Sequence, residues 1–196
     1  WDAPPTLPGT LSDAGYHTAI VGRSMHQFPV RKRFGYDEMV IADHKDSNNG
    51  YSRFLRRNSC QENPQWMDGG VMHNDWTAKP FHLDEPLHFT NWVVDEALDF
   101  LDRRDPSCPF FLTVSFLAPH PPLQPPAFYF ERYLRTGVPD ANIGDWAKPP
   151  ASWNVDSGRI NLQGEAFLSM RAAYYGLINH VDDQMQTRLP ERLGQQ

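Results

Sequence analysis

The sequence lacks the features that assign a chain to several large classes of protein. No apolar run approaches the roughly 20 residues that span a bilayer, so we expect no membrane-spanning helix. Basic residues are outnumbered by acidic ones, and the net charge of −6 leaves no basic field for nucleic acid phosphates. A glycine-rich phosphate loop and a Gly-x-Ser-x-Gly nucleophile elbow are both missing. We therefore predict that neither a membrane nor a nucleic acid is a partner.

Cysteine is scarce as well. Cys60 and Cys108 are the 2 cysteines of the chain, and neither lies at metal-ligand spacing from another ligand. Free thiols in a reducing compartment are the favoured interpretation, and a disulfide is the alternative. The compartment stays open between cytoplasmic and periplasmic or secreted, with the cytoplasm slightly favoured.

No residue cluster predicts a metal site. Asp182 and Asp183 are adjacent carboxylates, but consecutive residues on a helix diverge by about 100° and rarely bind one ion. They are interpreted as part of a solvated helix face. The same interpretation is favoured for the basic run Arg31-Lys32-Arg33, as a solvated surface rather than a phosphate site.

What is present is an alternation of helices and strands, which is typical of the α/β class. Thr90 is the expected N-cap of the third helix, and Pro190 is expected to end the last one. The unbroken apolar run 110–116 is typical of a strand covered on both faces, as in a parallel sheet. The predicted helices lie at about 6–14, 51–56, 90–105, 127–134 and 164–189, and the predicted strands at 16–22 and 110–116. The apolar face of the last helix is expected to consist of Phe167, Met170, Tyr174, Leu177, Ile178, Val181 and Met185.

The chain length favours a single domain. A chain of 196 residues builds one sizeable core and is too short for two comfortable ones. Residues 43–88 are polar and aperiodic, and we expect an irregular insertion there. The chain begins at Trp1 without an initiator methionine, and we expect it to be a piece of something longer.

Two histidines follow the predicted strands by the same number of residues. His26 lies four residues after Gly22, and His120 lies four residues after Phe116. Ligands of open α/β sheets collect at the carboxyl ends of the strands, so both rings are candidates for one pocket. The alternative is that each is an ordinary loop histidine.

Three segments make the chain resemble the sulfatase family of the alkaline phosphatase superfamily. The first is Leu11-Ser12-Asp13-Ala14-Gly15-Tyr16-His17-Thr18 with its continuation to Gly22, His26 and Phe34-Gly35-Tyr36-Asp37. The second is the strand at 109–116 followed by Leu117-Ala118-Pro119-His120-Pro121-Pro122, and the third is residues 174–184. The third segment is shared with relatives that cleave phosphate or phosphonate esters.

The resemblance implies a fold and a set of roles. The fold would be a partial alkaline-phosphatase-like sandwich, with a mostly parallel sheet flanked by helices. His26 would orient the nucleophile, and His120 would bind the sulfate and help the ester oxygen leave. The lysine that the family carries two residues before the first histidine is replaced by either Arg23 or Ser24. Arg23 is preferred because a sulfate oxygen needs a cation there.

The resemblance also implies parts that this sequence does not contain. Sulfatases use a formylglycine formed in a Cys/Ser-x-Pro-x-Arg motif, together with a divalent cation, usually Ca²⁺, held by Asp-containing pairs. Neither the motif nor those pairs occur in the chain. We therefore expect a parent sulfuric ester hydrolase and an inactive isolated chain. The alternatives are a phosphonate or phosphate ester hydrolase of the same superfamily, and a non-catalytic protein that kept the fold.

The expected substrate is a sulfate ester of a small molecule or a saccharide. Substrate-binding residues are sought in the segment 43–88, where Trp76, His82 and His88 combine stacking surfaces with directional donors. The alternative is that Trp66 and Trp76 anchor the segment to the body of the protein.

Overall fold

The computed structural model describes residues 4–24, 28–29, 31–42, 46–67, 70–71, 74, 76–142, 144–146, 162 and 164–193. The chain divides into two compact units. The first comprises Trp1–Pro64, Phe89–Leu117 and Gln184–Gln196, and the second comprises Gln65–His88 and Ala118–Asp183.

A three-stranded parallel sheet forms the centre of the first unit. Strand β1 (His17–Arg23) lies between β2 (Glu38–Ala42) and β3 (Phe110–Ser115), in the order β2-β1-β3. The register pairs Gly22 with Ser115, so the carboxyl ends of the strands lie at one edge of the sheet. This arrangement confirms the predicted parallel sheet.

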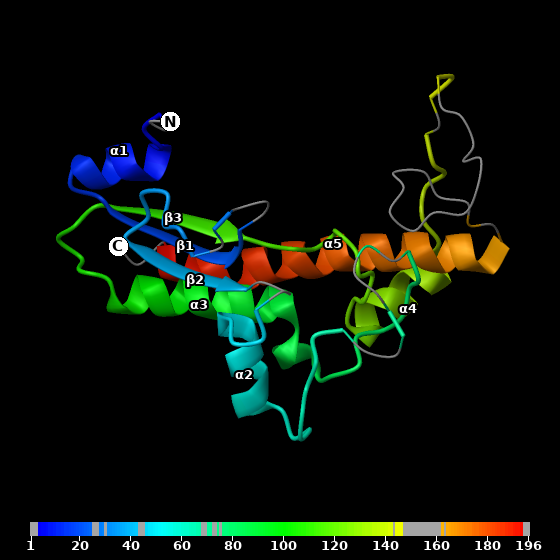
Figure 1. The fold of residues 1–196 in the computed structure, drawn as a ribbon. Helices are drawn as coiled ribbons and strands as arrows, with labels where there is room; N and C mark the ends of the chain where they lie inside the picture. Colours follow the sequence, from blue (N-terminus) through cyan, green and yellow to red (C-terminus); the bar gives the residue numbers. More distant parts are fainter. Residues whose placement is uncertain are drawn as a thin grey trace. The chain divides into compact units, whose positions relative to one another are not determined.

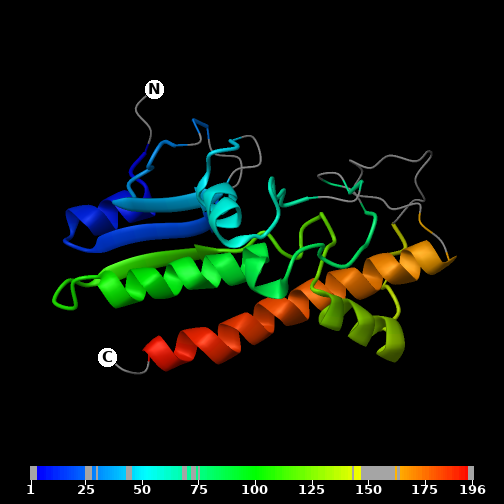
Figure 2. The ribbon, with the colours of Figure 1, turned by 90° about the horizontal axis from the view of Figure 1, so that it is seen from below.

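Helices cover both faces of the sheet, as predicted. In Figure 1, α3 (Phe89–Arg103) lies below the sheet and α1 (Leu7–Asp13) lies above it. Figure 2 shows α3 running along the strands, where it packs on β1 and β3. Helix α2 (Gly50–Asn58) contacts β2 and α3. The buried core of this unit includes Ala19, Ile20, Val21, Tyr51, Leu55, Trp92, Val93, Val94, Ala97 and Phe100.

The second unit is built from helices and loops. It contains the 3₁₀ helix η1 (Glu85–Leu87), helix α4 (Ala127–Thr136) and the residues of α5 (Gly164–Leu193) up to Asp183. Its hydrophobic core consists of Leu123, Phe130, Met170, Ala172, Ala173 and Leu177.

The predicted strands and helices are confirmed, but two predicted ends are wrong. Helix α3 begins at Phe89, so Thr90 lies in its first turn and is not the N-cap. Helix α5 continues through Pro190 to Leu193. Proline lacks only its own N–H, and in the last turn this removes a single intrahelical hydrogen bond.

The predicted apolar face of α5 is wrong at several positions. Tyr174, Ile178 and Met185 are 38–46% exposed, while the fully buried His180 lies on the inner face. Ala172 and Ala173 are buried, and a Cβ atom at Gly176 would lie 3.2 Å from the main chain of Tyr129. The buried face of α5 therefore includes small residues that the apolar pattern of large side chains did not predict. Although α5 has 30 residues, none of the described helices is long and apolar enough to cross a membrane.

Strands β2 and β3 depart from expectation because they lie at the edges of the described sheet. No strand was predicted at 38–42, where β2 starts with the charged Glu38. Each residue of β3 is only half-buried, so the run is less buried than its unbroken apolar sequence predicts. Edge strands are covered less than central ones, and composition does not report a strand's position in a sheet.

Candidate functional site

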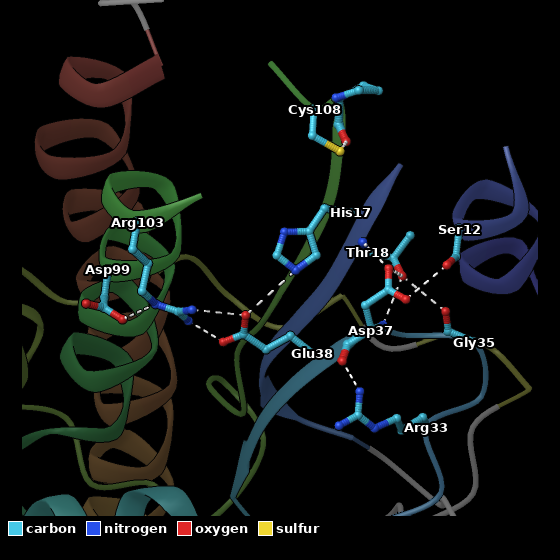
Figure 3. A network of polar contacts seen from close by, with 11 residues as sticks. Ser12, His17, Thr18, Arg33, Gly35, Asp37, Glu38, Asp99, Arg103 and Cys108 are labelled. Atoms are coloured by element: carbon cyan, nitrogen blue, oxygen red, sulfur yellow. Dashed lines mark hydrogen bonds and ion pairs between the residues drawn. The ribbon is translucent and has the colours of Figure 1, made fainter. Parts of the chain in front are cut away.

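The amino edge of the sheet is closed by a polar network around Asp37 (Figure 3). The Thr18 main-chain N–H and hydroxyl donate to one Asp37 carboxylate oxygen at 2.9 and 3.0 Å, and the Ser12 hydroxyl donates to the other at 2.9 Å. Hydrogen bonding from the Thr18 N–H, opposed by partial burial, lowers the pKa of Asp37. These bonds tie α1, β1 and the start of β2 together.

A second set of contacts at this edge joins β2 to α3. Arg103 pairs with Glu38 and donates to Asp99 at 2.7 Å, while the His17 ring lies 3.9 Å from Glu38. Arg33 donates to the Asp37 carbonyl. Every charged group in Figure 3 has a partner among the residues drawn. These residues bind one another, which favours a structural role for this part of the edge.

The carboxyl edge of the sheet holds Arg23. This residue ends β1, and its carbonyl accepts a hydrogen bond of 2.6 Å from the Ser115 hydroxyl at the end of β3. Gly22 has a φ of +104°, and a Cβ atom there would lie 2.0 Å from the Ser115 carbonyl oxygen. The close approach of β1 and β3 thus requires glycine beside Arg23.

His120 lies in the turn that follows β3. Its Nδ1 lies 2.6 Å from the carbonyl oxygen of Pro121. A carbonyl only accepts, so the proton is assigned to Nδ1 and the ring orientation is set by the main chain. Nε2 is then the acceptor nitrogen of the neutral ring. The loop contains two cis peptide bonds, at Ala118–Pro119 and at Pro121–Pro122.

The predicted meeting of His26 and His120 stays a prediction. His26 lies outside the described residues, and so does His73 in the aromatic segment. The Arg23 carbonyl is held by the Ser115 hydroxyl of β3, and the His120 ring is held by the Pro121 carbonyl of its own turn.

Trp76 and His82 are held by the second unit. Trp76 packs against the core that contains Leu123 and Phe130. The His82 Nε2 lies 2.9 Å from the Gln65 carbonyl, and its ring contacts Phe81 with centroids 5.1 Å apart. Both side chains therefore contribute to the scaffold of the segment, and their predicted substrate contacts stay predictions.

His88 is buried rather than displayed at the surface. Only 6% of it is exposed, and its Nε2 donates to the Gln124 carbonyl at 3.2 Å. Its ring lies edge-on to the ring of His180, with centroids 4.7 Å apart. His180 also contacts Tyr129 at 4.9 Å, and its Nε2 lies 3.7 Å from Glu85. The two imidazoles form a buried pair between η1, α4 and α5.

The environment of this pair favours neutral side chains. Burial lowers the pKa of His88 to about 4. Burial also lowers the pKa of His180 to about 2, and the neighbouring His88 makes a smaller contribution in the same direction. Burial, followed by the charge of Asp183, raises the pKa of Glu85. Burial also raises the pKa of Tyr129 to about 12, with contributions from Glu85 and Asp183.

Acid is expected to destabilise the chain through His88. In the folded state His88 binds a proton only near pH 4, whereas in the unfolded state it binds one near the ordinary pKa of 6.5. Stability due to this group is therefore complete above the unfolded value and is lost as the pH falls toward the folded one. We expect His88 to account for a drop of about 2 kcal/mol in the free energy of unfolding between about pH 7 and pH 5, and His180, whose pKa is also lowered, to add a similar drop. Urea unfolding measures the total.

The variant His88→Gln isolates this effect. Glutamine keeps a donor for Gln124 but does not titrate, so about half of the loss between neutral and acidic pH should disappear, while the part due to His180 remains. Glu85 acts in the opposite direction, because its raised pKa favours the folded state as the pH falls. An unchanged pH dependence in His88→Gln would assign the acid sensitivity to other groups.

Sequence reasoning missed His180 and Ser115. His180 follows the buried Ala173 and Leu177 by seven and three residues, a helical spacing that places it on the inner face. That spacing was available in the sequence. Ser115 gave no signal, because its contact with Arg23 depends on the pairing of β1 with β3.

The described residues contain no group of three or more histidine, cysteine, aspartate or glutamate side chains that could hold a metal ion. Both cysteines carry free thiols, as predicted. The described residues therefore do not form a site that fits the divalent cation that the resemblance implies.

Comparison with known proteins assigns the chain to a family. A family model described as Sulfatase matches residues 1–190. The chain belongs to the sulfatase family. An arylsulfatase of Clostridium perfringens is 36% identical to this sulfatase chain, over 94% of the chain and 42% of that relative. An uncharacterized sulfatase of Escherichia coli is 29% identical, over 92% of the chain and 36% of that relative. The chain spans less than half the length of these curated relatives.

Solved structures share the fold of this sulfatase chain. A phosphonate monoester hydrolase of Agrobacterium radiobacter has a TM-score of 0.65 at 18% identity, covering 97% of the chain and 44% of that structure. A protein in complex with its substrate D-glucosamine-2-N,6-O-disulfate has a TM-score of 0.54 at 18% identity, covering 97% and 46%. These likenesses confirm the α/β architecture predicted from the sequence.

Proposed function

We propose that the protein carrying this sulfatase chain hydrolyses sulfate monoesters. The observation that carries the proposal is the His120 turn at the carboxyl end of β3, in a chain that belongs to the sulfatase family. Hydrolysis breaks the bond between sulfur and the ester oxygen, and the leaving oxygen must gain a proton. Nε2 of His120 is suited to supply it from the imidazolium form of the ring, which becomes the neutral ring with its remaining proton on Nδ1, held by the Pro121 carbonyl.

Arg23 is proposed to supply positive charge for the sulfate. A guanidinium offers a planar fork of donors that matches two oxygens of a tetrahedral anion. His26 is proposed to orient the nucleophile. The proposed nucleophile is a formylglycine and the proposed metal is Ca²⁺, and both would come from outside the described residues.

The test uses a full-length enzyme that carries this sequence. We expect hydrolysis of 4-nitrophenyl sulfate, loss of activity with a chelator, and recovery with Ca²⁺. The 196-residue chain alone is the control and should show no turnover, because it has no formylglycine motif. Preference for a phosphonate monoester would favour the alternative hydrolase, and no turnover of either ester would favour a non-catalytic protein.

The segment containing His82 is proposed to contact the organic part of the substrate. In the full-length enzyme, we expect His82→Ala to lower kcat/KM for the native ester about tenfold, which corresponds to one lost hydrogen bond. A small aryl sulfate should lose less than about twofold, because it binds mainly through the sulfate.

Trp76→Ala is the companion variant. Because Trp76 packs on the core of the second unit, this change should also lower stability, and His82→Ala should do so less. Equal losses of kcat/KM on both substrates in His82→Ala would show that the segment is scaffold.

A further inference from the structure

A cavity of about 300 Å³ lies beside β2 and the start of α2, within the first unit. Residues 39–41 of β2 form one wall, and Arg31, Arg33 and Arg53 contribute guanidinium groups to the others. The cavity contains neither Arg23 nor His120. Its volume is at the lower end of the range of about 300–1,000 Å³ typical of small-molecule sites.

The described lining carries an excess of positive charge. It includes 3 guanidinium groups and 1 carboxylate, that of Asp46. Asp46 pairs with Arg31 at 2.6 Å. Arg33 and Arg53 donate instead to the main-chain carbonyls of Asp37 and Asn48, which have no net charge. Among the described residues, the three guanidinium groups therefore share the single carboxylate of Asp46, which interacts electrostatically with Arg31 and Arg53, in a protein whose overall charge is −6.

The start of α2 borders this cavity. Asn49 caps the helix by accepting from the Ser52 N–H at 2.9 Å, and Gly50 lines the cavity with bare backbone. A Cβ atom at Gly50 would lie 3.0 Å from the Trp92 ring and 3.3 Å from the Ile41 carbonyl oxygen. The amino end of a helix carries partial positive charge, so it reinforces the arginines.

We infer that this cavity is a second anion site, which binds an additional sulfate group of a saccharide that carries more than one. The inference rests on the proposed function, because it assigns the substrate class. Guanidinium groups bind two oxygens of a tetrahedral anion at once, and the walls from β2 supply apolar area for the sugar ring. The run Arg31-Lys32-Arg33 is exposed to solvent, as the sequence predicts. Arg31 and Arg33 of this run also line the cavity.

The test measures binding by the 196-residue chain with isothermal titration calorimetry at physiological ionic strength. The probes are a disulfated glucosamine disaccharide, its monosulfated analogue, inorganic sulfate and inorganic phosphate. We expect the disulfated saccharide to bind at least about tenfold more tightly than the other three. This gain corresponds to one further charge-assisted hydrogen bond.

Two variants on α2 distinguish a defined anion site from non-specific attraction by positive charge. Arg53→Gln removes a guanidinium from the cavity and should weaken binding of the disulfated saccharide about tenfold. Arg57→Gln makes the same change on the same helix but away from the cavity, and should change binding less than about twofold. Asp46→Asn removes the competing carboxylate and should tighten binding, which a folding defect would not do.

Equal losses in Arg53→Gln and Arg57→Gln would overturn the inference in favour of unspecific charge attraction. Inorganic sulfate or phosphate binding as tightly as the saccharide would overturn it in favour of a free-anion site, and absence of binding would overturn it outright. Hydrolysis of an aryl sulfate by the full-length enzyme tests the proposed function separately. The second anion site can therefore fail while the proposed function stands.

Discussion

Gly22→Ala is expected to lower the free energy of unfolding by at least about 3 kcal/mol, because two penalties act at one position. The φ of +104° is strained for any residue with a Cβ atom, and that atom would lie 2.0 Å from the Ser115 carbonyl oxygen. Main-chain oxygen of a paired strand cannot move aside as a flexible side chain can. The strands would have to separate at the edge that holds Arg23. Urea unfolding of the two chains measures the loss.

Gly15→Ala is the matched control. Gly15 also has a positive φ, +91°, but a Cβ atom there would meet nothing within 4 Å. Only backbone strain remains, and we expect a loss of about 1 kcal/mol. If both variants lost the same stability, the contact between β1 and β3 would not be the reason why position 22 is glycine.

His120→Ala is expected to lower kcat/KM of the full-length enzyme by about 10²–10⁴, the usual contribution of a positioned general acid. The loss should be largest for an alkyl sulfate, whose alkoxide leaves slowly without a proton. It should be smaller for 4-nitrophenyl sulfate, because the nitrophenolate leaves readily. Steady-state kinetics on the two esters provides the comparison.

His120→Asn separates proton transfer from positioning. The asparagine amide can still donate to the Pro121 carbonyl, as Nδ1 does, but it has no group in the place of Nε2. We expect it to be as impaired as His120→Ala on the alkyl sulfate. Activity close to wild type in His120→Asn, or equal losses on both esters in His120→Ala, would exclude His120 as the acid.

The elements that local sequence signals specify were predictable. Thr6 precedes α1 and accepts from the Gly9 N–H, and the β-branched and aromatic runs at 17–23 and 110–115 form strands. Helix α3 has apolar residues at helical spacing, and it buries them. In each case the information lies within a dozen residues, which is the range over which periodicity can be read.

The elements that depend on distant contacts were not predictable in the same way. Strand β2 is short and begins with Glu38, and its identity depends on pairing with β1. Burial of His88 and His180 depends on the meeting of η1, α4 and α5. The cavity brings together Arg31 and Arg53, which are 22 positions apart in the sequence. The basic run by itself indicates positive charge but not which distant residues line a cavity with it.

The polar network at Asp37 has a consequence for how members of this family are recognised. Thr18, Gly35 and Asp37 belong to the first segment that resembles sulfatases, yet they lie at the amino edge of the sheet and bind one another. Arg23 and the end of β3 lie at the opposite edge. A descendant that lost all hydrolytic chemistry would still need the Asp37 network to fold, and so would keep this part of the family signature. Similarity at Thr18 and Asp37 thus reflects conserved architecture, whereas Arg23, His26 and His120 are the positions that the proposed function would require in a relative that hydrolyses an ester.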